Sequence, residues 1–118
     1  MRRTPLIELL WFQDCPNHEA TEALLRERMA QAGMTAPVHR VEVADEETGM
    51  RLRFPGSPTV RIDGLDVEPG WEWSGDGTPR CRLYATSRGL RGVPDAEWID
   101  AALTRAAAAG PDDGGARS

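Results

Sequence analysis

Residues 6–18 read Leu-Ile-Glu-Leu-Leu-Trp-Phe-Gln-Asp-Cys-Pro-Asn-His, a nearly continuous apolar run followed by a cysteine and a proline. Apolar runs of this length between turn-forming residues are typical of strands that are buried on both faces. Pro16 suits the first position of a helix, because its missing N–H would have no partner there. We therefore predict a central strand over residues 6–12, and a helix that starts at Asp14 or Cys15 and stops at Gly33.

The next part of the chain continues the alternation of strands and helices. Residues 37–43 and 59–62 have the β-branched and alternating character of strands. Asp45 is expected to cap a short helix that runs to about Arg53. The third strand ends at Asp63-Gly64, a pair that predicts a tight turn.

The last part of the chain is less regular. Residues 65–80 show no sustained period and are predicted to form one long loop. Residues 81–84 are predicted as a fourth strand, and residues 85–93 as a connection. Asp95 is expected to cap a last helix that ends at Gly110. The apolar face of that helix is formed by Trp98, Ile99, Ala102, Leu103 and Ala106.

Length and composition bound the classes of protein that the chain can belong to. With 118 residues it has the length of one domain, which we assign to residues 1–110, with a disordered tail over residues 111–118. The formal net charge of -5 argues against a surface that binds nucleic acid. No apolar run is long enough to span a bilayer, and the N-terminus lacks the features of a secretory signal. We therefore expect a cytoplasmic protein without nucleic-acid or membrane partners, and no cofactor is indicated.

The order strand, helix, strand, helix, strand, strand, helix resembles the core of the thioredoxin-like superfamily, which includes the glutaredoxins. Two local features add to the resemblance: Cys15-Pro16 at the start of the first helix, and a segment before the third strand that resembles the cis-proline turn of that superfamily, Gly56-Ser57-Pro58-Thr59-Val60. The resemblance implies an α/β fold of three layers, with the order βαβαββα and a four-stranded mixed sheet flanked by helices.

Three segments are similar to a group of small bacterial thioredoxin-like proteins that have a single cysteine in a Cys-Pro-Asn motif: Phe12-Gln13-Asp14-Cys15-Pro16-Asn17, Gly56-Ser57-Pro58-Thr59 and Cys81-Arg82-Leu83-Tyr84. Some relatives of that kind look distantly similar to organomercurial-lyase-related domains. One departure from the superfamily matters, because His18 stands where its dithiol members have a second cysteine. The usual resolving thiol is therefore absent, and the resemblance implies a redox protein with a monothiol mechanism.

Cys15 is the first candidate catalytic residue. A thiol at a helix N-terminus is reactive because unpaired backbone N–H groups favour the thiolate, which is the attacking species. His18, three residues further on, can add a positive charge or a hydrogen bond, whereas the carboxylate of Asp14 opposes a second negative charge. The structural alternatives are that Cys15 is a small buried apolar residue and that His18 is a surface residue.

Pro58 is the second feature of the candidate site. In a cis peptide it would hold the Ser57 backbone near the sulfur, where the N–H and C=O groups can pair with an extended thiol substrate. The alternative is an ordinary trans turn proline. With Pro16, Asn17 and Thr59, Ser57 forms the predicted substrate-binding set.

Cys81 and the tryptophans have two interpretations each. Cys81 is either a core residue or a resolving or metal-sharing thiol, and the rise along a strand places it on the order of 10 Å or more from Cys15. Trp71 and Trp73 form either a recognition element or a satellite apolar cluster in the long loop. Trp11 and Trp98 are expected in the core.

Three functional hypotheses follow. The first is a thiol-dependent redox or thiol-transfer protein, an oxidoreductase in which Cys15 attacks a disulfide or takes up a glutathione-like adduct, Pro58 orients the partner, and an external thiol resolves the intermediate. Its partner would be a small thiol or disulfide such as glutathione, or a partner protein. The second is a protein that binds mercury or copper(I) through Cys15 with Cys81 or His18. The third is an inert adaptor that binds a partner through its tryptophan loop.

Overall fold

The computed structural model describes residues 4–73, 75 and 77–108. The described elements, in chain order, are β1 (Ile7–Trp11), α1 (His18–Gln31), β2 (Val38–Glu42), α2 (Glu46–Leu52), β3 (Thr59–Ile62), β4 (Leu65–Asp66), β5 (Tyr84–Thr86), β6 (Gly89–Arg91) and α3 (Ala96–Ala108). The predicted end of the last helix at Gly110 and the predicted tail over residues 111–118 lie outside the described residues. None of the helices in the described part is long and apolar enough to cross a membrane.

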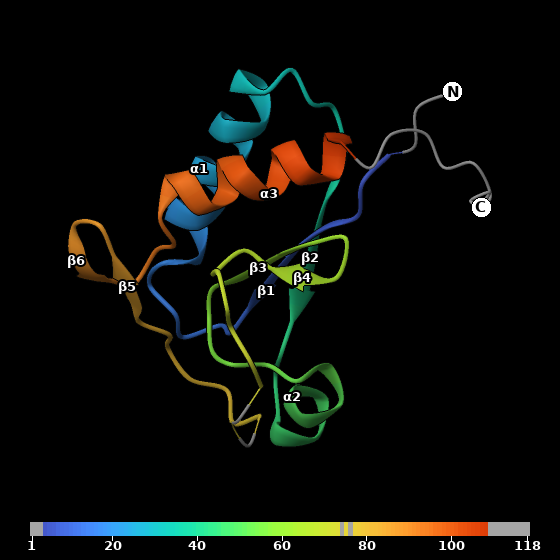
Figure 1. Cartoon of the computed structure of the whole chain (residues 1–118). Coiled ribbons are helices and arrows are strands. Elements are labelled where there is room, and N and C mark those ends of the chain that lie inside the picture. Colours follow the sequence, from blue (N-terminus) through green and yellow to red (C-terminus); the bar gives the residue numbers. More distant parts are fainter. Residues whose placement is uncertain (1–3, 74, 76, 109–118) are drawn as a thin grey trace.

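Four of the strands form one mixed sheet in the order β2-β1-β3-β4 (Figure 1). Strand β1 is parallel to β2 and antiparallel to β3, which is in turn antiparallel to β4. An interior strand of a covered sheet is buried on both faces and so carries a continuous apolar run. The prediction that the first strand is central is therefore confirmed.

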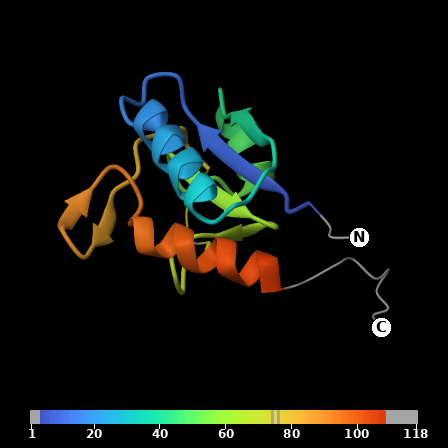
Figure 2. The same ribbon diagram turned by 90° about the horizontal axis from the view of Figure 1, so that it is seen from above.

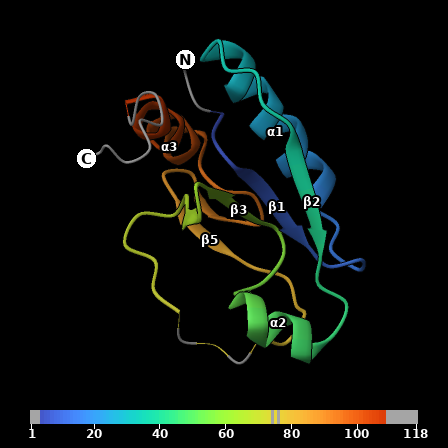
Figure 3. The same cartoon turned by 90° about the vertical axis from the view of Figure 1, so that its right-hand side faces the viewer.

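Helices cover both faces of this sheet. Helices α1 and α3 lie side by side over one face, and α2 lies on the opposite side (Figures 2 and 3). Ile7 and Leu9 of β1 pack into the core under α1 and α3, whereas Leu10 packs with Val43 and Phe54. Successive side chains of a strand point to opposite faces, so β1 supplies both cores. The molecule is therefore a mixed α/β protein of three layers.

Helix α1 begins later than the sequence predicts. The helix starts at His18, not at Asp14 or Cys15, and Asn17 is its N-cap residue. The preceding residues form a turn in which the Cys15 N–H donates to the Phe12 carbonyl oxygen, at 2.9 Å. The C-terminal prediction is confirmed, because Ala32 caps the helix and Gly33 has the left-handed φ of 67° that favours glycine.

The caps of α2 and α3 are those predicted. The Asp45 side chain accepts from the Thr48 N–H at 2.8 Å, and Asp95 accepts from the Glu97 N–H at 3.0 Å. The apolar face of α3 is also confirmed, with four buried residues: Ile99, Ala102, Leu103 and Ala106. Trp98 packs against the same core but is only partly buried.

Gly49 has a packing role in α2. A Cβ atom at Gly49 would lie 1.7 Å from the carbonyl oxygen of Gly77, so the long loop approaches the helix where no side chain intervenes. In the opposite direction, a Cβ at Gly77 would lie 2.4 Å from the Met50 nitrogen. The two glycines therefore allow the loop to pack directly on the helix backbone.

The predicted fourth strand at residues 81–84 is wrong. The fourth strand of the sheet is β4, Leu65–Asp66, which follows β3 through a two-residue turn at Asp63 and Gly64. Both turn residues have positive φ, 56° and 83°, as the tight hairpin turn requires. A strand of two residues is too short to show a period, and for this reason the sequence pattern misses it.

The connection predicted over residues 85–93 contains a separate hairpin. Strands β5 and β6 pair with each other outside the main sheet and project to one side of the molecule (Figure 1). The Asp95 carboxylate accepts hydrogen bonds from the N–H and the hydroxyl of Ser87 at the hairpin turn, at 3.1 and 2.8 Å. The same side chain therefore joins the hairpin to the start of α3.

Candidate functional site

The Cys15 thiol lies in the turn between β1 and α1, and only 3% of the residue is exposed. Its sulfur accepts a hydrogen bond from the Asn17 N–H at 3.3 Å and donates to the Ser57 carbonyl oxygen at 3.4 Å. The amide donor strengthens as its acceptor gains negative charge, so it suits a sulfur that carries charge during exchange. Cys15 is thus buried, as the alternative of a small buried apolar residue predicted, but its sulfur makes polar contacts.

Ser57 connects the turn that bears Cys15 to the segment that bears Cys81. The Ser57–Pro58 peptide bond is cis, as the resemblance implied. The Ser57 N–H donates to the Arg80 carbonyl oxygen at 2.7 Å, and the Ser57 carbonyl oxygen accepts from the Arg82 N–H at 2.8 Å. The Ser57 hydroxyl accepts from the Phe12 N–H at 3.0 Å. The backbone groups that we expected to pair with an extended substrate are therefore already paired with residues 80–82.

Cys81 lies opposite Ser57 in this short parallel bridge, and its side chain is exposed. The prediction that it fills the core is therefore wrong. The separation of about 10 Å or more from Cys15 was also wrong, because it assumed a fourth strand that enters the sheet at its far end. Residues 80–82 instead run alongside Ser57, whose carbonyl oxygen receives the Cys15 thiol.

The surroundings of the Cys81 thiol, Cys15 among them, shift its pKa. Desolvation by the surrounding chain raises the pKa of Cys81 above the ordinary thiol value. Negative charge at Cys15 and a hydrogen bond with the Cys15 side chain raise the pKa further, as does the Asp14 carboxylate. At neutral pH Cys81 is therefore mainly the neutral thiol, a poor nucleophile but an accessible sulfur.

Arg82 fixes the segment that carries Cys81. Its guanidinium donates to both carboxylate oxygens of Asp66, at 2.7 and 3.1 Å, and to Glu68 at 2.7 Å. It also donates to the Thr59 hydroxyl at 3.0 Å and lies over the Tyr84 ring, 4.3 Å from the centroid. The side chains of Arg82 and Asp66 are only 6% and 3% exposed, so this is a buried ion pair. Asp66 and Glu68, two residues apart in the long loop, were the sequence signal for this ion pair. The loop has no sustained period, so the pattern did not single them out.

The predicted substrate-binding residues have structural contacts of their own. The Thr59 hydroxyl donates to the Gly56 carbonyl oxygen at 2.6 Å, and the Pro58 carbonyl oxygen accepts from the Tyr84 hydroxyl at 2.5 Å. The Asn17 amide packs against Gly92, where an added Cβ would lie 2.2 Å from its nitrogen. Pro16 is exposed beside Cys15. Burial also raises the pKa of Tyr84, which therefore remains a hydrogen-bond donor at neutral pH.

The predicted role of His18 next to Cys15 stays a prediction. The imidazole stacks on the indole of Trp11, with ring centroids 4.7 Å apart and planes inclined by 35°. Trp11 is thus half-buried against His18, not enclosed in the core. The structure brings Cys15, Ser57, Pro58 and Cys81 together and places His18 against β1.

A cavity of about 360 Å³ opens beside Cys81. Trp71, Trp73, Arg80 and Leu83 are among its lining residues, with Cys81 itself. The Trp71 ring also lies 5.7 Å from the Arg82 guanidinium carbon. The two tryptophans of the long loop therefore adjoin the exposed thiol.

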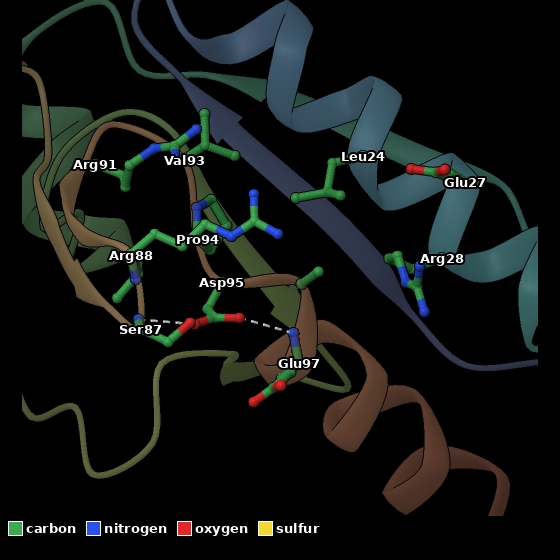
Figure 4. Close-up of a pocket in the computed structure, with 12 residues that line it drawn as sticks. Leu24, Glu27, Arg28, Ser87, Arg88, Arg91, Val93, Pro94, Asp95 and Glu97 are labelled. Carbon is green, nitrogen blue, oxygen red and sulfur yellow. Dashed lines mark hydrogen bonds between the residues drawn. The ribbon is translucent and has the colours of Figure 1, made fainter.

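A second cavity of about 350 Å³ lies away from the thiols, between α1, the β5–β6 turn and the start of α3 (Figure 4). Figure 4 shows Asp95 between Ser87 and Glu97, to which its hydrogen bonds are drawn. Asp95 thus serves to cap the helix and hold the hairpin. Among the described residues, no group of three or more His, Cys, Asp or Glu side chains is arranged to hold a metal ion.

Comparison with known proteins finds no family model, no curated protein and no solved structure that matches this chain.

Proposed function

We propose that this protein is a thioredoxin-like thiol–disulfide redox protein in which Cys15 and Cys81 form the redox-active pair. The observation that carries the proposal is the meeting of both cysteines at Ser57: the Cys15 thiol donates to its carbonyl oxygen, and Cys81 pairs with its backbone. The mixed sheet with β1 in its interior and a cysteine in the turn after β1 supports the thioredoxin-like assignment.

The position of Cys81 determines the kind of mechanism. The monothiol hypothesis needed an external thiol because the usual resolving position holds His18. Because Cys81 lies opposite Ser57, whose carbonyl oxygen accepts from the Cys15 thiol, the resolving thiol comes from the same chain, from the segment that follows the long loop. Oxidation joins the two sulfurs with loss of two protons and two electrons, and the electrons pass to a disulfide that is reduced to two thiols.

The test is gentle oxidation of the reduced protein with oxidised glutathione, followed by mass spectrometric mapping of both cysteines. We expect a Cys15–Cys81 disulfide that is absent from the Cys15→Ser and Cys81→Ser variants. A stable glutathione adduct on Cys15 with Cys81 left free would restore the monothiol mechanism. If neither product forms, the adaptor hypothesis replaces the redox one.

Two neighbouring thiols also favour a second candidate, a two-thiolate site for a soft metal ion such as copper(I) or mercury(II). Titration with mercury(II), followed by the ultraviolet absorption of the metal–thiolate bond, tests this candidate. A shared site predicts that the band is lost in both single-cysteine variants, whereas a band that survives in either variant would contradict it.

A further inference from the structure

The two sulfurs of the proposed redox pair differ in their access to partners. Cys15 is 3% exposed and lies in the turn that leads into α1, whereas Cys81 is exposed and lines the cavity beside Trp71 and Trp73. Disulfide exchange requires an in-coming sulfur to reach one of the two protein sulfurs. Of the two sulfurs, only that of Cys81 is accessible to an incoming sulfur.

The pairing of Ser57 restricts what kind of partner can approach. An extended peptide binds by adding a strand to free backbone N–H and C=O groups. The N–H and C=O groups of Ser57 are occupied by Arg80 and Arg82, and the buried Arg82–Asp66 pair holds that segment in place. A peptide would have to displace residues 80–82, whereas a small molecule need not.

The cavity fits a small ligand. Its volume of about 360 Å³ is at the lower end of the range for small-molecule sites. The two indoles supply flat apolar walls that can cover the carbon skeleton of a ligand, and Arg80 and Glu72 supply charged groups at the lining. This composition suits a compact molecule with both apolar and ionised parts.

We propose that Cys81 is the sulfur that exchanges with outside partners, that these partners are low-molecular-weight thiols, and that the cavity beside Trp71 and Trp73 holds them. This inference rests on the proposed redox pair and reverses the order of roles expected from the sequence. Cys15 becomes the internal sulfur and Cys81 the external one.

The proposed exchange takes two steps. The thiolate of a small thiol attacks the Cys81 sulfur of the oxidised protein, a bond forms between those sulfurs, and the Cys15–Cys81 bond breaks. The bonding electron pair leaves on Cys15, where the Asn17 N–H donates to the sulfur. A second small thiol attacks the first, releases the small disulfide and leaves Cys81 as a thiolate that takes a proton from water. In sum, two thiols are oxidised and one protein disulfide is reduced.

The first experiment uses the unmodified protein with glutathione as the probe. The oxidised protein is mixed with reduced glutathione, the reaction is quenched with acid at early times, and the adduct is located by peptide mapping. We expect the adduct on Cys81, and an adduct mainly on Cys15 would overturn the inference. Failure of the proposed function is distinct, because the Cys15–Cys81 disulfide would not form at all.

The second experiment tests the cavity and the size of the partner. The Trp73→Ala variant should lower the rate constant for reduction of the oxidised protein by glutathione about tenfold, since an aromatic wall is lost. The matched control is Leu90→Ala, which removes an exposed apolar side chain on β6. A ten-residue peptide with one cysteine should react more slowly than glutathione. An unchanged rate in Trp73→Ala, or faster reaction with the peptide, would contradict the assignment of the cavity to small thiols.

Discussion

At the scale of single residues, Arg82 forms a buried ion pair with Asp66 and directly follows the exposed Cys81 in the chain. Arg82 binds Asp66 through two hydrogen bonds and reaches Glu68 and Thr59 as well. Buried ion pairs contribute little net stability as pairs, but the loss of one partner leaves an uncompensated buried charge. The position of the Cys81 segment therefore depends on the arginine.

The Arg82→Met substitution tests this dependence. We expect the free energy of unfolding to fall by about 3–5 kcal/mol, because the Asp66 carboxylate would remain buried without its partner. Urea unfolding measures the change. Arg26→Met, which breaks an exposed pair with Glu22, is the matched control and should cost less than about 1 kcal/mol. Equal effects of the two variants would show that the Arg82 pair is not buried.

Gly49 gives a second prediction at this scale. Replacement of a helical glycine by alanine ordinarily stabilises a helix by up to about 1 kcal/mol. Gly49→Ala should instead destabilise the protein by about 1–3 kcal/mol, because its Cβ would meet the Gly77 carbonyl oxygen. Thermal or urea unfolding measures the sign. Stabilisation would mean that the long loop does not pack on α2.

At the scale of elements, local patterns predicted the strands and helices that are long enough to have a period. The buried apolar run predicted β1. The cap at Asp45 predicted α2, and the apolar face after Asp95 predicted α3. Strand β4 and the β5–β6 hairpin were missed because strands of two or three residues are fixed by their pairing partners. Propensity and periodicity carry no information on such partners.

The candidate site was predicted in part for the same reason. Cys15 lies in a contiguous motif that the sequence shows directly, and the cis Ser57–Pro58 bond was expected from the resemblance of residues 56–60 to the thioredoxin-like turn. The approach of Cys81 depends on a bridge to Ser57 and on an ion pair between Arg82 and Asp66. Both contacts join positions that are far apart in the chain, and a single sequence does not show them.

Asp95 gives the prediction that belongs to this scale, since it joins the hairpin to α3. Hydrogen bonds from the Ser87 and Glu97 backbone N–H groups, together with the Ser87 hydroxyl, hold the pKa of Asp95 below its usual value. A carboxyl whose folded pKa is lowered stabilises the protein above the unfolded pKa, which is about 4, and loses that contribution as the pH falls.

The Asp95→Asn variant should therefore be less stable than the parent at pH 7, and the difference should shrink as the pH falls through about 4. Urea unfolding of both proteins over a series of pH values measures this trend. A difference in stability that stays constant with pH would show that the charge on Asp95 does not contribute.

At the scale of the whole molecule, a Cys15–Cys81 disulfide would enclose most of the described chain, from the end of β1 to the segment after β4. Crosslinks that close long loops restrict the unfolded state most. We expect the oxidised protein to be more stable than the reduced protein by roughly 4 kcal/mol. Calorimetry with and without a reducing agent measures the difference in Tm, and Cys81→Ser, with no disulfide to form, should show no such difference. A reduced protein as stable as the oxidised one would imply a strained bond.

The alternation of side chains along residues 80–82 has a consequence for protein engineering. In this segment Cys81 lies opposite Ser57, the residue that accepts from the Cys15 thiol, and the Arg82 side chain donates to Asp66. Successive residues of an extended chain alternate in direction. Burial of the Arg82 guanidinium therefore also fixes the direction of the Cys81 side chain. Lengthening the loop before Arg80 would leave the direction of Cys81 relative to Arg82 unchanged. Inserting one residue between Cys81 and Arg82 would turn the Cys81 thiol away from Cys15, although both cysteines would still be present in the chain.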